Sequence, residues 1–64
     1  MSERELVSIV WHRNAPQVIQ RIYVGGPLER VSGNRAQAEE MAESEGFRLV
    51  PTPVHLIKWV KEVP

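Results

Sequence analysis

The chain has 64 residues, no cysteine, and eight basic and eight acidic side chains that cancel in formal charge. This length corresponds to one domain, so residues 1–64 are expected to form a single unit with 1–4 frayed. The missing cysteines exclude disulfides and thiolate zinc sites. With two histidines and only Glu as acid, no metal or cofactor is expected.

The first predicted element is a strand over residues 6–12. Val7, Ile9 and Trp11 share one face at a period of two, and β-branched and aromatic residues dominate the segment. The breaker cluster at 13–16 ends it, because its proline cannot donate to a ladder.

Residues 18–24 fit two periods, as a strand or as a helix beginning at Pro16. Two Val, two Ile and a Tyr in seven residues favour a strand. Gly25-Gly26-Pro27 ends it. We therefore expect the first two strands to form a hairpin closed around Asn14.

After an expected loop over 28–33, the sequence predicts a helix from about Arg35 to Glu45. Asn34 is a good N-cap, and Gln37 lies three residues later, as in a capping box. Gly46 stands where a left-handed residue commonly ends a helix. Small apolar residues form the inner stripe of this helix, so it must lie close to what it covers. Its glutamates form a polar face.

A short strand is expected over residues 47–50, followed by a second helix over 54–63. Thr52 and Pro53 form a helix start signal. At 100° per residue, most apolar side chains of 54–63 fall within one arc, whereas Lys58 interrupts the alternation of a strand. A fourth strand remains the alternative for this last element.

The predicted fold class is therefore a small α+β domain of order β-β-α-β-α. It has a three-stranded, largely antiparallel sheet with both helices on one face, and the other face open or closed by a second copy. The side chains expected to be buried are Val7, Ile9, Trp11, Ile22, Met41, Phe47, Leu49, Leu56, Ile57 and Val60.

Few residues suggest chemistry. His12 and His55 have no Asp to orient an imidazole, and two histidines are too few for a zinc site, so no catalytic residue is predicted. Trp11, Trp59 and Tyr23 are large enough to anchor an interface or to fill the core.

Two local resemblances concern nucleotides. Residues 21–26 resemble the first RNA-contacting strand of RNA-recognition domains, which implies that Tyr23 stacks on a base; the second aromatic motif of that family is absent. Residues 21–51 are similar to the opening β-α-β of the nucleoside deoxyribosyltransferase-like family, through Ile22-Tyr23-Val24-Gly25-Gly26-Pro27, Asn34, Ala38, Ala42, Gly46 and Pro51. That resemblance implies a nucleotide near Gly25-Gly26-Pro27, although the chain lacks the length and the Asp for the rest of the family's pattern.

A domain this small buries about 60% of the surface that its unfolded chain exposes, so it usually needs an additional source of stability. Here that source would be a partner or a second copy of the chain. We therefore expect a non-enzymatic protein-interaction module (an adaptor, inhibitor or accessory subunit), with a homodimer as one form. Nucleic-acid binding through Arg13, Arg21 and Arg30, or nucleotide binding at the glycine loop, are the alternatives. No membrane segment or signal peptide is seen, so the expected location is cytoplasmic.

Overall fold

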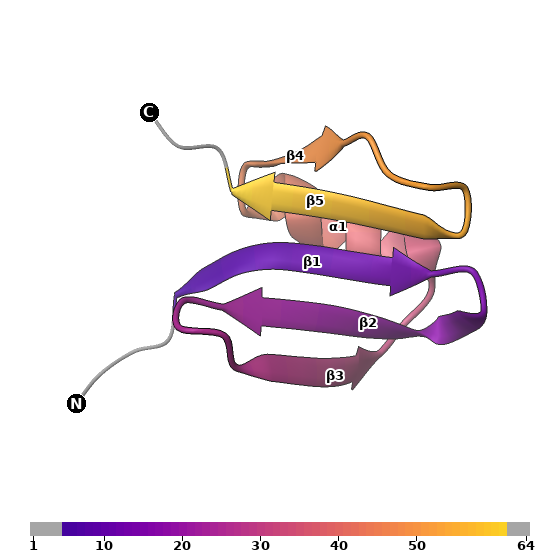
Figure 1. The fold of residues 1–64 in the computed structure, drawn as a ribbon, viewed down its shortest axis with the longest axis horizontal. Coiled ribbons are helices and arrows are strands. Elements are labelled where there is room, and N and C mark those ends of the chain that lie inside the picture. Colours follow the sequence, from indigo (N-terminus) through magenta and orange to yellow (C-terminus); the bar gives the residue numbers. More distant parts are fainter. Residues whose placement is uncertain (1–4, 62–64) are drawn as a thin grey trace.

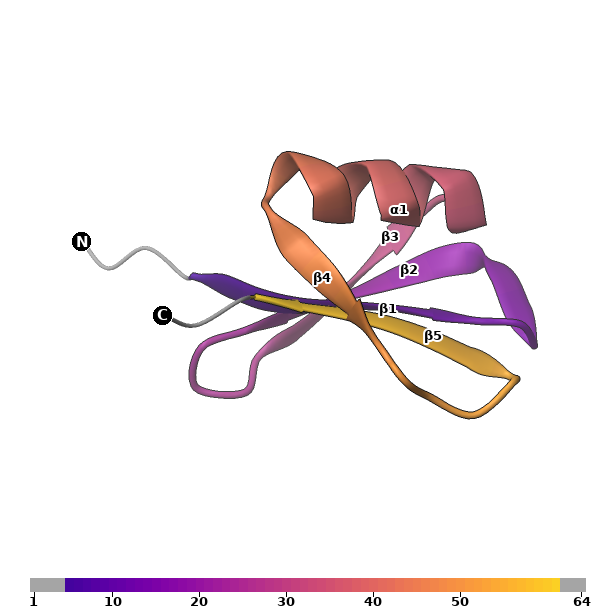
Figure 2. The ribbon, with the colours of Figure 1, turned by 90° about the horizontal axis from the view of Figure 1, so that it is seen from above.

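The computed structural model describes residues 5–61, and the fraying expected for 1–4 lies outside this range. Five strands form one antiparallel sheet in the order β3-β2-β1-β5-β4 (Figure 1). A single helix lies against one face of this sheet, and no element of residues 5–61 covers the other (Figure 2). In chain order the elements are β1 (Leu6–His12), β2 (Ala15–Tyr23), β3 (Leu28–Ser32), α1 (Arg35–Ser44), β4 (Phe47–Val50) and β5 (Leu56–Lys61).

The predicted arrangement of three strands and two helices is wrong. Residues 28–32, expected in a loop, form the edge strand β3. Residues 56–61, expected in a helix, form β5 beside the central strand β1, as in the alternative kept for this segment. Side chains alternate along a strand, so Ile57 and Trp59 face α1 while Lys58 faces away. Lys58 is therefore compatible with a strand, because it lies on the side of the sheet that no other element of residues 5–61 covers.

The predicted hairpin is confirmed, but its turn is shorter than the breaker cluster at 13–16: only Arg13 and Asn14 form it, and β2 begins at Ala15 rather than near Val18. Its pairing is irregular near the turn: Trp11 pairs with Ile19 but His12 pairs with Ala15, so residues 16–18 have no partner in β1. A proline is tolerated within a strand at such a bulge. The indole N–H of Trp11 donates to the carbonyl of Pro16 at 3.1 Å, which satisfies both groups.

The helix predicted from about Arg35 to Glu45 is confirmed as α1, which ends at Ser44 with Glu45 as its C-cap. Both hydrogen bonds of the predicted capping box are present between Asn34 and Gln37. Gly46 has a φ of +76°, as its place after the C-cap requires. Ala38 and Ala42 are fully buried, so the helix backbone approaches the sheet closely. No helix among residues 5–61 combines the length and apolar character needed to cross a membrane.

The core lies between α1 and the middle of the sheet, where Ile9, Trp11, Ile19 and Trp59 pack against the two alanines of α1. The expected burial of Leu49 is wrong, because this side chain is 63% exposed on an edge strand. Three further residues expected in the core are only half-buried and belong to the uncovered face: Ile22, Leu56 and Val60. The expected place of Val7 in the core is also wrong, because the pairing is irregular between Leu6 and Ser8 and Leu6 packs against the core instead.

Candidate functional site

The uncovered side of the sheet, which we call the open face, is built from the strand positions that alternate with the core residues. Cross-strand pairing aligns these positions in rows that run from β3 to β4. One row consists of Leu28, Ile22, Ser8, Val60 and Arg48. The next row consists of Arg30, Gln20, Val10, Lys58 and Val50.

The centre of the open face is apolar and well covered by its own side chains. Val10 is only 5% exposed although no other element lies over it. Its direct neighbours in the pairing are Gln20 and Lys58, whose long apolar stems can lie across it. Ser8 is also buried, and its hydroxyl donates to the carbonyl of Trp59 at 3.2 Å. Its polar group is thus satisfied within the sheet.

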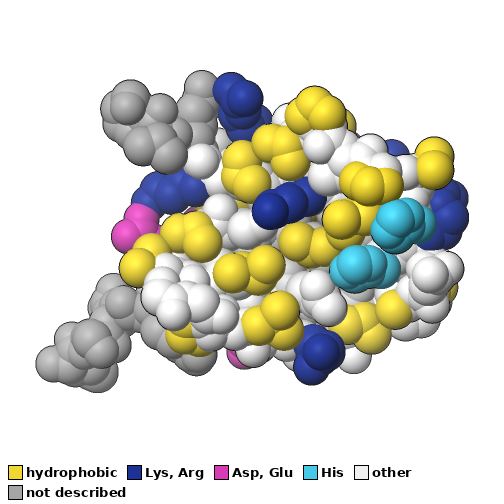
Figure 3. Space-filling view, viewed as in Figure 1, with side chains coloured by type: hydrophobic (Ala, Val, Ile, Leu, Met, Phe, Trp, Pro, Cys, Tyr) yellow, Lys and Arg dark blue, Asp and Glu magenta, His cyan; other side chains and the backbone are white. Residues whose placement is uncertain are grey.

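The charges in the two rows of the open face all have one sign. Arg30 and Arg48 lie on the two edge strands and Lys58 lies near the middle, while neither row contains an acid. Figure 3 shows basic side chains scattered among hydrophobic ones on this side. The glutamates of residues 5–61 lie outside these two rows, and acidic side chains are visible only at the edge of this view (Figure 3). Glu5 pairs with Lys61, Glu29 lies beside Arg21, and the others belong to α1 or its C-cap. The domain therefore separates a basic sheet face from an acidic helix.

Both histidines lie at one end of this face. His12 pairs with Leu56 across β1 and β5, and the backbone N–H of Arg13 donates to the carbonyl of His55 at 2.9 Å. Figure 3 shows the two imidazoles next to one another. Within residues 5–61, no group of three or more His, Cys, Asp or Glu side chains could hold a metal ion. The pair adds imidazole groups to the rim of the open face.

The three aromatic residues predicted as interface anchors lie on the opposite side, in or beside the core. Trp11 and Trp59 are 7% and 6% exposed. Tyr23 is also buried, its hydroxyl donates to Glu29 Oε1 at 2.7 Å, and the guanidinium of Arg21 lies 5.8 Å from its ring centre. None of the three is presented to a partner in the isolated chain.

The arginines predicted to contact nucleic acid are not brought together. Arg13 lies in the hairpin turn, where its Nε donates to the carbonyl of Val54 at 3.3 Å. Arg21 lies on the helix side, next to Glu29. Only Arg30 belongs to the open face.

The loop at Gly25-Gly26-Pro27 does not lead from a strand into a helix, which is the arrangement that the nucleotide-binding resemblance implied. Gly25 and Gly26 have φ values of +90° and +104° and turn the chain from β2 directly into the antiparallel β3. The helix begins only after β3, at the other end of that strand (Figure 1). The loop and the N-terminus of α1 therefore do not form a shared phosphate site.

Sequence reasoning missed Arg48 and Lys58 as site residues. Lys58 did leave a signal, because a single basic residue inside an apolar alternation is typical of a strand whose second face is not covered. Arg48 alternates with apolar neighbours in the same manner. No local signal could show that these two cations share a face with Arg30, since β3 and β4 lie at opposite edges of the sheet.

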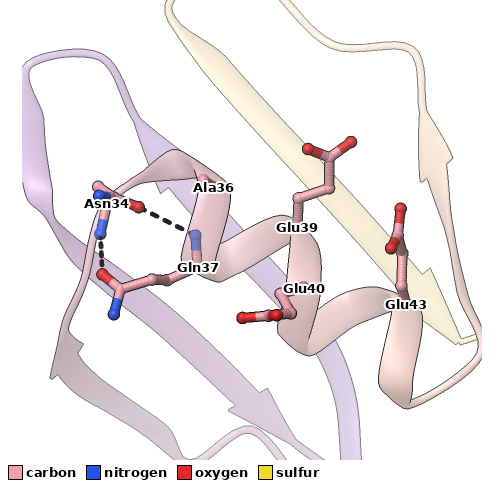
Figure 4. Close-up of a pocket in the computed structure, with 6 residues that line it drawn as sticks. All are labelled: Asn34, Ala36, Gln37, Glu39, Glu40 and Glu43. Carbon is pink, nitrogen blue, oxygen red and sulfur yellow. Dashed lines mark hydrogen bonds between the residues drawn. The ribbon is translucent and has the colours of Figure 1, made fainter.

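A hollow on the outer surface of α1 has a volume of about 410 Å³ (Figure 4). It is lined by Asn34, Ala36, Gln37, Glu39, Glu40 and Glu43. The amide side chains of its first turn are occupied by the capping box, and its carboxylates spread apart along the helix. This surface is a solvated helix face, and nothing on it indicates a ligand.

Comparisons with models of protein families, with curated proteins and with solved structures gave no match to this chain. Its function must therefore be argued from its own residues.

Proposed function

We propose that this chain is a non-enzymatic interaction module that binds an acidic, partly apolar surface of a partner protein through the open face. The observation that supports this proposal is the uncovered face itself. Apolar side chains occupy its centre, and Arg30, Arg48 and Lys58 provide charge without any acid in the same rows. Val10 itself is buried, but Ile22 and Val60 beside it are half-buried and Leu28 is exposed, so apolar surface remains accessible on this face. Such surface commonly marks an interaction site, and complementary charge selects the partner.

The composition of the face favours a protein over a nucleic acid. Proteins that bind single-stranded nucleic acid stack the bases on exposed aromatic side chains. Here both tryptophans lie in the core and Tyr23 is buried, and the two rows of the open face contain no Phe, Tyr, Trp or His. The two histidines lie only at the rim of the face. Basic charge alone would give weak binding that does not depend on sequence.

The charge of the face also argues against a second copy as its occupant. A two-fold dimer that packs open face on open face would bury the same three cations from each chain in one interface. Like charges in such an interface cost several kcal/mol. The homodimer expected from the small size of the chain is thus a poor fit for this surface, and a partner with acidic groups around an apolar centre fits better.

The proposal is tested by comparing the wild-type chain with Lys58→Glu and Arg48→Glu variants in capture from native lysate. Mass spectrometry identifies proteins retained by the wild type, and titration with the purified partner gives dissociation constants. Arg35→Glu is the matched control, because it makes the same charge change at the start of α1, away from the two rows. Circular dichroism verifies that all variants are folded.

We expect each open-face variant to weaken binding of the purified partner by about tenfold or more, and the control to bind as the wild type does. Added salt should weaken the wild-type complex as well. Equal binding by wild type and Lys58→Glu would refute the proposal. The proposal would also be refuted if nuclease treatment released the captured proteins. It would be refuted as well if the lysate yielded nothing except further copies of this chain.

A further inference from the structure

A separate hollow lies where the β1–β2 turn, the first residue of α1 and the loop between β4 and β5 meet. Its volume is about 330 Å³. Arg13 and Arg35 are the charged residues that line it, and Leu49 and Val54 are among its apolar lining residues. Pro51 and Pro53 also line it. We call this hollow the arginine notch; the two rows of the open face touch it only at Val50.

Hydrogen bonds hold the wall of the notch in place. The hydroxyl of Thr52 donates to the carbonyl of Leu56 at 2.6 Å, which fixes the loop against the start of β5. The backbone N–H of Arg13 donates to the carbonyl of His55, and the side-chain Nε of Arg13 donates to the carbonyl of Val54. The second bond orients the guanidinium of Arg13 toward the loop and leaves its two terminal amino groups without an acceptor among residues 5–61. The notch is thus formed in the free chain.

The notch attracts negative charge. Its lining contains two arginines and no acid. Neither arginine takes part in an ion pair in residues 5–61, where the pairs are Arg21–Glu29 and Lys61–Glu5. Arg35 is also the first residue of α1, whose first turn has no acid. A cation at the positive end of the helix dipole is unfavourable there, and a nearby anion would relieve this.

The notch also exposes apolar surface. Leu49 is 63% and Val54 is 83% exposed, and they are two of the four large hydrophobic side chains that stand out among residues 5–61. We propose that the notch binds a small molecule that carries a carboxylate on an apolar body. Guanidinium groups recognise a carboxylate through charge-assisted hydrogen bonds, and the volume lies at the lower end for small-molecule sites.

The probe is hexanoate, titrated into the ¹⁵N-labelled chain while two-dimensional amide spectra are recorded. Acetate supplies the charge without the apolar body, and 1-hexanol supplies the apolar body without the charge. We expect saturable shifts at Arg13, Arg35, Leu49 and Val54 with hexanoate. Affinity should be about millimolar, as suits a ligand of so few atoms, and acetate and hexanol should each bind about tenfold more weakly or worse.

Arg35→Gln and Arg13→Gln should each weaken hexanoate binding by about tenfold, since each removes a charge-assisted contact. Arg35→Gln is the safer variant because Arg13 also supports the loop. Arg48→Gln is the matched control and should bind as the wild type does, because Arg48 does not line the notch. Equal shifts with acetate, shifts confined to the open face, or unchanged binding by both notch variants would overturn the assignment. Since Lys58→Glu leaves the notch intact, failure at the notch is distinguishable from failure of the proposed protein interface.

Discussion

Gly33 precedes the N-cap of α1 at a point where the chain passes directly over the core. A Cβ atom built on Gly33 would lie 2.5 Å from Cδ1 and 3.3 Å from Cγ1 of Ile19. Ile19 is completely buried, so its side chain has little room to move. The backbone N–H of Gly33 also donates to the carbonyl of Gln17 at 2.9 Å, which holds the glycine against β2. This position requires glycine because there is no room for a Cβ atom between the backbone and Ile19.

Gly33→Ala should therefore lower the free energy of unfolding by about 1–3 kcal/mol, the usual range for overpacking a core. In a domain of this size each kcal/mol corresponds to a fall of about 4–8 °C in Tm. The measurement is urea unfolding followed by tryptophan fluorescence and circular dichroism. A neutral or stabilised variant would refute the steric reasoning.

Ile19→Val provides the control for this clash, because it removes the Cδ1 atom that the new methyl group would meet. Alone it should destabilise the chain by about 0.5–1.5 kcal/mol. In the Ile19→Val background, the added effect of Gly33→Ala should fall by about 1–2 kcal/mol, since the two residues are in contact. Strictly additive effects would show that Gly33→Ala acts through something other than Ile19.

Two further predictions concern the helix cap and the aromatic core. Asn34→Ala should lower the free energy of unfolding by about 1 kcal/mol, while Asn34→Asp should be nearly neutral; equal losses in urea unfolding would show that the cap bond does not matter. Trp11 and Trp59 are both buried, so native fluorescence should be blue-shifted relative to the unfolded chain and resist quenching by iodide. Emission that is quenched equally in the native and unfolded chain would contradict this placement.

The elements that sequence reasoning identified correctly are those with strong local signals. The helix was bounded by Asn34, Gln37 and Gly46, whose roles depend only on near neighbours. The hairpin followed from two β-rich segments around a breaker cluster. In both places the deciding interactions join residues close in sequence, so they can be read without the fold.

The errors arose where the deciding contact lies far away in sequence. The sequence predicts a helix over 54–63 because most of its apolar side chains fall within one arc at 100° per residue, whereas Lys58 interrupts the alternation of a strand. The segment is instead a strand beside β1, with Trp59 toward the helix and apolar residues on its second side too. β3 has Leu28 and Val31 on opposite sides, so no alternation marked it. The cations of the open face likewise meet only through the order of the strands.

The partition of side chains between the two faces explains what kind of binding the open face can support. A ten-residue helix with alanines toward the sheet can cover only its centre, so the tryptophans are needed there to fill the core. This leaves the open face without the Trp and Tyr anchors that dominate many interfaces. Of the three residue types that are enriched at such anchor positions, only arginine is present on this face. Its binding energy must then depend more on charge than on aromatic burial. A complex formed through this face should accordingly associate quickly and weaken with salt, so salt dependence and the Lys58→Glu variant probe the same physical cause.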